Sequence, residues 1–280
     1  MKIKFYIVAI LTIVILGFGL FQIQKRIDNR RSLSEELVQE MLYFPSGRFL
    51  KETTAGFETF FADLVWLRCI QYYGRNLIKF EITKKRNYRY LYHILDVLTT
   101  LDPYFIVAFD FGAIILAESA QEINHSLKLL DKGIILNPDE WRLPFIKGFI
   151  YYIYLRQYQN AARFFILSAK KPHSPDMPRR FAAFIYFKKA NRLDVSFSLW
   201  YEIYKNTKNS MERETAARNL TEIDAEKLQQ VVDKFINSKG RVPISLDELV
   251  KEGFIDKIPE LFAGKAYYID GEGKVKIKWE

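Results

Sequence analysis

Three histidines and a single cysteine are the residues of this chain whose types could support metal binding or nucleophilic chemistry. His93, His125 and His173 lie far apart in the sequence. None belongs to a His-Glu-x-x-His grouping, which would place two ligands on one helix face. Cys69 is the only cysteine, which excludes an intrachain disulfide and a multi-cysteine zinc site, and its apolar neighbours predict a buried, inert thiol. The sequence also lacks a Gly-x-Ser-x-Gly elbow and a glycine-rich phosphate loop. We therefore expect a protein that is not an enzyme and that has no catalytic residues, cofactor or metal.

Asp63 and Arg68 are charged residues inside an otherwise apolar segment, residues 57–74. Five residues of helix turn through about 500°, so the two side chains do not meet on one face. We expect each of them to cap or bridge a neighbouring helix. The alternative is a buried switch or a contact with a partner.

The elements that would position such residues repeat at a spacing of 35 residues. Ile123, Tyr158 and Leu193 occupy equivalent places in three amphipathic helical patterns. In each pattern a small residue is followed four places on by a bulky one, an arrangement that lets neighbouring helices approach closely. Repetition at this period indicates stacked supersecondary units rather than one globular core. The aligned sets are Ser126, Ala161 and Ser196, then Leu130, Phe165 and Trp200, then Gly133, Ser168 and Ile203, and an earlier copy has Tyr88, Leu91, Leu95 and Leu98. We expect the basic stretch 75–87 before this earlier copy to be a connection between helices.

The repeat resembles the tetratricopeptide repeat (TPR), a pair of antiparallel helices of about 34 residues. In one copy Gly148 lies in the first helix, and Tyr158, Ala161 and Phe165 lie in the second. The resemblance implies an α-solenoid, and an irregular helical bundle is the alternative. Further matches are Gly112, the closing turns Leu101-Asp102-Pro103 and Leu136-Asn137-Pro138, and the segment Ala62-Asp63-Leu64-Val65-Trp66-Leu67-Arg68, which is similar to a segment of bacterial TPR proteins.

TPR arrays bind their partners through a concave face lined by first helices, and the resemblance implies such a groove here. Aromatic residues dominate the corresponding positions, and the Lys and Asn pattern that grips acidic carboxylate tails is absent. An aromatic groove suits an apolar or amphipathic peptide or helix. The alternative is that these rings are buried as core. The predicted groove positions are Phe109, Ala113 and Leu116, then Phe145, Phe149 and Tyr152, then Arg180, Phe184 and Phe187.

The N-terminus carries a candidate membrane anchor. Residues 5–21 are apolar except for Thr12, a run near the shortest length that spans a hydrocarbon core of about 30 Å. A cleaved signal peptide is the alternative, although no Ala-x-Ala site follows the run. Basic residues flank the run on both sides. Because short N-terminal tails usually stay inside, we expect a single-pass protein of the inner (cytoplasmic) membrane whose body is extracytoplasmic.

The charge balance is basic. Lys and Arg total 42 against 33 Asp and Glu, a formal net charge of +9, which suits an anionic partner. Basic residues gather between 156 and 192, where we expect solvated outer faces of helices. The alternative is an electropositive flank that attracts anionic lipid or an acidic peptide. No nucleic-acid recognition motif is present, and we expect no nucleic-acid partner.

Residues 223–280 depart from the repeat. The pattern predicts a helix, a second short helix, and a hairpin whose Val275, Ile277 and Trp279 face the helix. The order of these elements resembles the globular end of type II secretion pseudopilins. The acidic loop that forms the calcium site of that family is missing here.

Together these patterns predict a mainly α protein with a TPR-like α-solenoid, an N-terminal transmembrane helix and a small C-terminal α+β module. The expected organisation is an anchor at 1–24, a juxtamembrane linker at 25–56, helical repeats at 57–222 and the C-terminal module at 223–280. Such a protein would act as a membrane-anchored scaffold that binds a protein or peptide partner during assembly of a bacterial envelope complex, of a secretion or pilus-like kind. The alternative is a non-catalytic accessory subunit of a membrane enzyme complex, with the groove aromatics buried as core.

Overall fold

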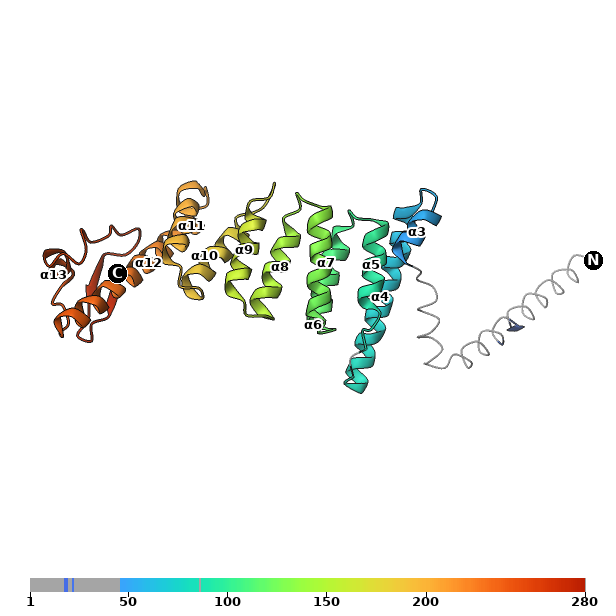
Figure 1. The fold of residues 1–280 in the computed structure, drawn as a ribbon, viewed down its shortest axis with the longest axis horizontal. Helices are drawn as coiled ribbons and strands as arrows, with labels where there is room; N and C mark the ends of the chain where they lie inside the picture. The colour runs from blue at the N-terminus through green and yellow to red at the C-terminus, as the bar shows by residue number, and fades with distance from the viewer. Residues whose placement is uncertain (1–17, 20–21, 23–45, 86, 280) are drawn as a thin grey trace, which may run out of the picture.

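The computed structural model describes residues 18, 19, 22, 46–85 and 87–279. Within these residues the protein is mainly helical, with one small two-stranded sheet near the C-terminus (Figure 1). Almost all of the predicted anchor, and residues 25–45 of the predicted linker, lie outside the described residues. In the described part of the chain, no helix combines the length and the apolar character needed to cross a membrane.

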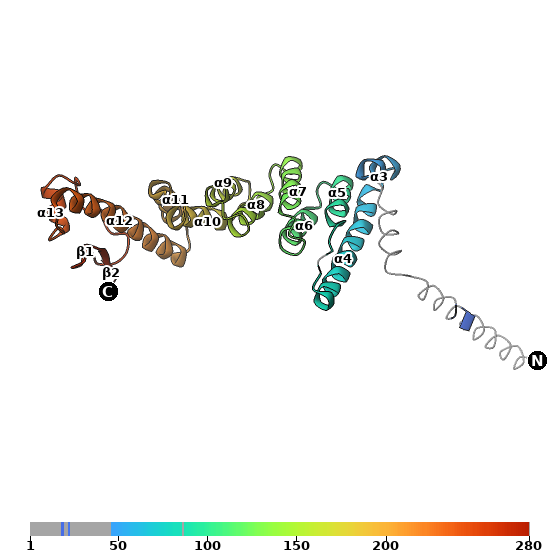
Figure 2. The ribbon, with the colours of Figure 1, turned by 60° about the horizontal axis from the view of Figure 1, so that its bottom comes forward.

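The helices stack in chain order along the long axis of the molecule (Figures 1 and 2). They are α3 (Gly47–Thr53), α4 (Glu58–Thr83), α5 (Leu91–Leu101), α6 (Ile106–Glu118), α7 (Ile123–Leu136), α8 (Arg142–Ile153), α9 (Tyr158–Ala169), α10 (Met177–Lys188), α11 (Leu193–Asn206), α12 (Ser210–Lys239) and α13 (Leu246–Lys251). Helices that follow one another in the chain pack together, most extensively α8 with α9, α9 with α10, and α11 with α12. Such repeat-like packing of adjacent helices gives each helix mainly local contacts.

The predicted spacing of the helices is confirmed. α7, α9 and α11 begin at Ile123, Tyr158 and Leu193, the three residues that the repeat aligns. The aligned small and bulky positions are all buried, as expected for residues where neighbouring helices cross. They are Ser126, Ala161 and Ser196, then Leu130, Phe165 and Trp200, then Gly133, Ser168 and Ile203, and in the earlier copy Tyr88, Leu91, Leu95 and Leu98.

The small positions bring the second helix of a pair against the backbone of the first. The hydroxyl of Ser126 donates a hydrogen bond of 2.7 Å to the carbonyl oxygen of Ala113. The hydroxyl of Ser196 donates an equivalent bond of 2.8 Å to the carbonyl oxygen of Ala183. A larger residue at either site would separate the helices and break the bond, so the small side chain sets the spacing.

Three predicted boundaries differ from those of the structure. The basic stretch 75–87 was predicted to be a connection, but α4 continues to Thr83 and ends at Lys84, which has a φ of 56°. The predicted linker contains α3, and the side chain of its N-cap residue Ser46 accepts a hydrogen bond from the Phe49 amide. The predicted border at 222/223 lies inside α12, a single helix of 30 residues. The repeats and the C-terminal module therefore share one helix.

The C-terminal module packs on the second half of α12. Strands β1 (Ala266–Ile269) and β2 (Val275–Lys278) form an antiparallel hairpin. The Gln229 side chain on α12 accepts a 2.8 Å hydrogen bond from the Val275 amide and donates a 3.0 Å bond to the Gly273 carbonyl. Val275 packs against the module core, as predicted. Trp279 is 42% exposed, and the Arg218 guanidinium of α12 lies 5.8 Å from the centre of its ring.

The buried apolar side chains of the described residues form several clusters along the array. The largest joins α4 through α8, and a second joins α8, α9 and α10. α12 takes part in two others, one with α10 and α11 and one with the C-terminal module. The Phe262 ring of the module also packs on three aromatic rings of α11, with centroids 5.5–6.0 Å apart.

Candidate partner-binding surface

The helix contacts fix which positions of the first helices α6, α8 and α10 are equivalent. Ala113 and Ala183 accept the serine hydrogen bonds from the second helices. Gly148 occupies the same place in the middle pair, because a Cβ added there would lie 3.2 Å from the Ala161 carbonyl oxygen. The equivalent residues are therefore Ala113, Gly148 and Ala183, which corrects the sequence alignment by one residue in α6, where Gly112 had been matched to Gly148.

This correction removes the α6 residues from the predicted groove. Phe109 is fully buried, and a Cβ added at Gly133 would lie 2.8 Å from its ring. Ala113 and Leu116 are also fully buried. The positions of α6 that are equivalent to Phe145 and Phe149 are instead Asp110 and Ile114, and Ile114 is 43% exposed.

Phe145 and Phe149 lie together, as predicted, but their rings are half-buried in an aromatic cluster. Their centroids are 4.9 Å apart in an edge-to-face arrangement. Phe181 lies 5.0 Å from Phe149 and 5.9 Å from Phe145, and the fully buried Phe165 lies 5.3 Å from each of them. Such pairs stabilise a core beyond their buried area. These two rings therefore join α8, α9 and α10 while keeping one side toward solvent.

The other predicted groove residues lie in different environments from Phe145 and Phe149. Phe184 is 39% exposed on α10. Tyr152 packs on Tyr158 with ring centroids 5.7 Å apart, at the turn between α8 and α9. Phe187 is only 9% exposed and belongs to the cluster shared with α11 and α12, so it cannot line an open groove. Arg180 pairs with Glu212 of α12 at 3.4 Å.

Two charged residues near these positions, Asp110 and Arg142, were not predicted from the sequence. Oδ1 of Asp110 is buried and has no hydrogen-bond partner among the described residues. Burial raises the pKa of Asp110 to about 6, an effect that the nearby Arg142 guanidinium partly opposes. Arg142 lies at the start of α8 and pairs with Glu140 at 2.9 Å. A single Asp in an apolar helix was not recognised from the sequence, because only the corrected alignment of α6 places it at the position equivalent to Phe145.

We call the resulting surface the first-helix face. It joins apolar rings and side chains of three successive first helices with a charged residue on each of them. Its half-buried aromatic centre and its more exposed margins could hold an extended or helical segment that has apolar side chains. Its members are Asp110, Ile114, Arg142, Phe145, Phe149, Arg180 and Phe184.

The remaining candidates for chemistry are placed outside this face. Cys69 is fully buried, and burial raises the pKa of its thiol to about 12. His125 stacks on Tyr92 with ring centroids 4.3 Å apart and contacts Glu122 at 2.8 Å. Asp63 and Arg68 are exposed on α4, where the Arg68 guanidinium donates a 3.4 Å hydrogen bond to Gln71 of the same helix. Neither residue pairs with another helix among the described residues, so the expectation that they cap or bridge a neighbouring helix is wrong.

Comparison with protein-family models, with curated proteins and with solved structures finds no match for this chain.

Proposed function

We propose that this protein is a membrane-anchored, non-enzymatic scaffold of the TPR type, which binds an apolar or amphipathic segment of a protein partner on the first-helix face. The observation that carries the proposal is the repetition of this face on α6, α8 and α10. Equivalent positions on the three helices hold Ile114, Phe149 and Phe184, and two of these side chains are about 40% exposed.

The chemistry of the face favours a peptide over a small molecule. Apolar side chains at one period along successive helices match a segment that places side chains at regular intervals. The charged groups at the margins, Arg142 and Arg180, already pair with Glu140 and Glu212. Because these arginines are paired, the apolar side chains supply most of the affinity, with the charges selecting orientation.

The anchor is the second part of the proposal. The apolar run 5–21 would hold the chain in the inner membrane, with the array on the extracytoplasmic side. A scaffold in that position would serve the assembly of an envelope complex, of a secretion or pilus-like kind. The resemblance of residues 223–280 to a pseudopilin end supports this setting.

The experiment compares two phenylalanines that differ in burial. Phe184→Ala removes an exposed ring, so we expect binding to fall by about 2 kcal/mol or more while the melting temperature stays close to that of the wild type. Phe149→Ala removes a ring from the aromatic cluster, so we expect it to cost about 3–5 kcal/mol of folding stability. Crosslinked capture of the partner from membranes and thermal melts of both variants give the two readouts.

Leu167→Ala is the matched control, because Leu167 is 37% exposed but lies on the second helix α9. It should change neither capture nor melting. Undiminished capture by Phe184→Ala, or equal loss with Leu167→Ala, would remove the first-helix face as the binding site.

A further inference from the structure

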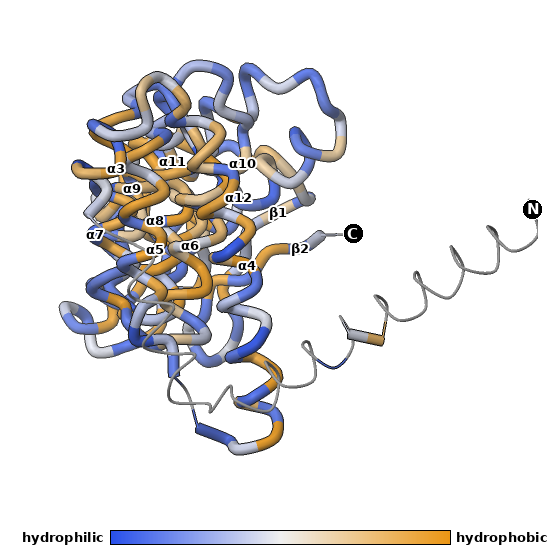
Figure 3. Tube along the Cα trace, turned by 90° about the vertical axis from the view of Figure 1, so that its right-hand side faces the viewer, coloured by the Kyte–Doolittle hydropathy of each residue, from blue (hydrophilic) through white to orange (hydrophobic). Residues whose placement is uncertain are grey.

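The first long helix of the array carries a row of large apolar side chains that no described residue covers. Phe57, Phe60, Leu64, Leu67 and Ile78 are 66%, 57%, 44%, 57% and 62% exposed. The opposite side of α4 packs on α5. Figure 3 shows the array from this end, with apolar stretches of α4 in orange. Because the end helix of a stacked array needs a polar outer face to stay soluble, this row requires a cover.

The row has the spacing of a coiled coil. Its positions alternate in steps of three and four residues, the a and d pattern of a heptad. Large apolar side chains fill four successive a and d positions at the start of the row and one a position further along. The a and d positions are Phe57, Phe60, Leu64, Leu67, Gln71, Gly74, Ile78 and Glu81, of which five carry large apolar side chains.

Asp63 and Arg68 flank the row at the positions that set the pairing of coiled coils. In this register Asp63 is a g position and Arg68 is the e position of the next heptad. The two side chains lie about 140° apart around one helix, on opposite sides of the row. In a parallel pair of identical helices, each g residue faces the e residue five places further along the other helix. Asp63 of each copy would then meet Arg68 of the other.

We propose that this protein forms a parallel homodimer through α4, with the row from Phe57 to Glu81 as the seam and two symmetric Asp63–Arg68 ion pairs beside it. Asp63 and Arg68 point too far apart around the helix to pair within one chain, but their spacing lets them pair between two chains. Gln71 at an a position would fix the register, as polar residues at this position do. The proposal does not depend on the first-helix face. A parallel arrangement also agrees with two chains that enter one membrane in the same direction.

Cysteine crosslinking of the purified full-length protein in detergent tests the seam and its direction. Phe60→Cys places a thiol at a d position, which lies beside its own copy in a parallel dimer. We expect mild oxidation to give a disulfide-linked dimer at ~5-fold or higher yield than the control Thr59→Cys, an exposed position of α4 that lies off the row. The native Cys69 does not compete, because it is fully buried. Both sites are exposed, so circular dichroism melts should match the wild type.

Charge reversal tests the ion pairs in the Phe60→Cys background. Asp63→Arg should place two arginines together on each side of the seam and lower the crosslink yield by ~5-fold. Arg68→Asp should have a similar effect, and the double variant Asp63→Arg/Arg68→Asp should restore the yield. If the two charges acted independently of each other, the double variant would not restore the crosslink yield.

The proposal is overturned if Phe60→Cys gives no dimer above the Thr59→Cys control. It is also overturned if Phe60→Cys forms a disulfide with Ile78→Cys instead of with itself. These residues lie about 27 Å apart along the helix, and they would meet only in an antiparallel pair. A Phe60→Cys thiol that is shielded from a water-soluble maleimide without forming a dimer would show that a lipid surface or another protein covers the row.

Discussion

At the scale of single residues, Asp110 shows how the apolar interior of the array changes the chemistry of one carboxyl group. Its Oδ1 atom is buried without a described partner, and burial raises its pKa to about 6. The charged form is therefore disfavoured in the folded protein relative to the unfolded chain. For a carboxyl whose folded pKa is raised, its contribution to stability is fully present below the unfolded pKa and is lost as pH rises through the folded pKa.

Asp110→Asn should therefore stabilise the protein above about pH 6, because the amide cannot ionise. We expect a higher melting temperature than that of the wild type at about pH 8, with most of the difference lost at about pH 4. Thermal melts at the two pH values measure the effect. Asp139→Asn, at an exposed position, is the control. An equal shift at both pH values would show that ionisation of Asp110 does not affect stability.

At the scale of elements, the small residues at the helix crossings determine how closely the pairs pack. Ala161 is fully buried where α9 meets α8, and its carbonyl oxygen lies 3.2 Å from the place where a Gly148 Cβ would be. A side chain at Gly148 would thus crowd the α9 backbone, and the enclosed Ala161 side chain lies at the same crossing. The same crossing holds a serine in the neighbouring pairs, at Ser126 and Ser196.

Ala161→Leu should force α8 and α9 apart and destabilise the protein by about 1–3 kcal/mol through overpacking. Gln159→Leu adds a similar side chain at an exposed position of the same helix and should have little effect. Chemical denaturation of both variants gives the free energies of unfolding. A neutral Ala161→Leu variant would contradict the proposed role of the small position.

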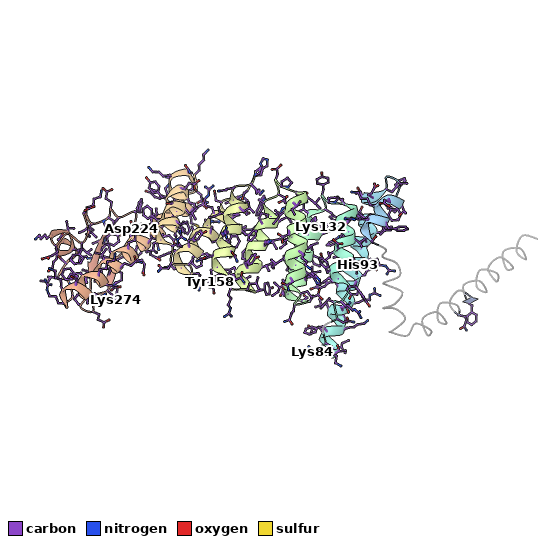
Figure 4. All side chains as sticks on the ribbon, viewed as in Figure 1. Lys84, His93, Lys132, Tyr158, Asp224 and Lys274 are labelled. Carbon is purple, nitrogen blue, oxygen red and sulfur yellow. The ribbon has the colours of Figure 1, made fainter. Side chains whose placement is uncertain are left out.

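The elements also show what the sequence could and could not predict. The starts of α7, α9 and α11 followed from the repeat, because small and bulky residues must alternate where helices cross. The alignment of α6 with the other first helices could not be predicted, because Gly112 and Ala113 are both small. Only the hydrogen bond from Ser126 to the Ala113 carbonyl distinguishes them. The end of α4 was missed because that part of the helix extends beyond its neighbours, with Lys84 at its tip (Figure 4). A helix without packing partners there needs no apolar pattern.

The candidate binding surface was predictable to a similar extent. Periodicity located Phe145, Phe149 and Phe184 on first helices, but it could not show how far each ring is covered. Coverage depends on residues from other helices, such as Phe165 and Phe181, whose proximity to Phe149 is set by the packing of three helices. Asp110 could be recognised only once its helix was aligned through contacts.

At the scale of the whole molecule, α12 makes the last repeat and the C-terminal module interdependent. Phe235→Ala removes a fully buried ring from the module cluster and should cost about 3–5 kcal/mol. Because α12 and Phe262 connect the module to α11, hydrogen exchange in α11 should also become faster. Phe109→Ala in the distant α6 is the comparison, and it should leave exchange in α11 unchanged. Slow exchange in α11 of Phe235→Ala would show that the two parts unfold independently.

The proposed anchor predicts how the full chain partitions. The wild-type protein should stay with membranes after a carbonate wash if the apolar run 5–21 spans the bilayer as proposed. Deletion of residues 1–24 should release a folded body, with circular dichroism as the check on folding. Recovery of a mature chain that begins near residue 20–25 would show instead that the segment is a cleaved signal.

The side-by-side packing of the helices along one axis also determines the length of the protein. Its two described ends lie at opposite extremes of the long axis, with α3 at one and the β-hairpin at the other (Figure 1). The seam of the proposed dimer is the outer face of α4, which runs across this axis, so the two arrays would extend from it in opposite directions and hold their hairpins far apart. In that arrangement the number of repeats sets the distance between the two hairpins, and the loss of one helix pair from each chain would shorten it by the thickness of two layers.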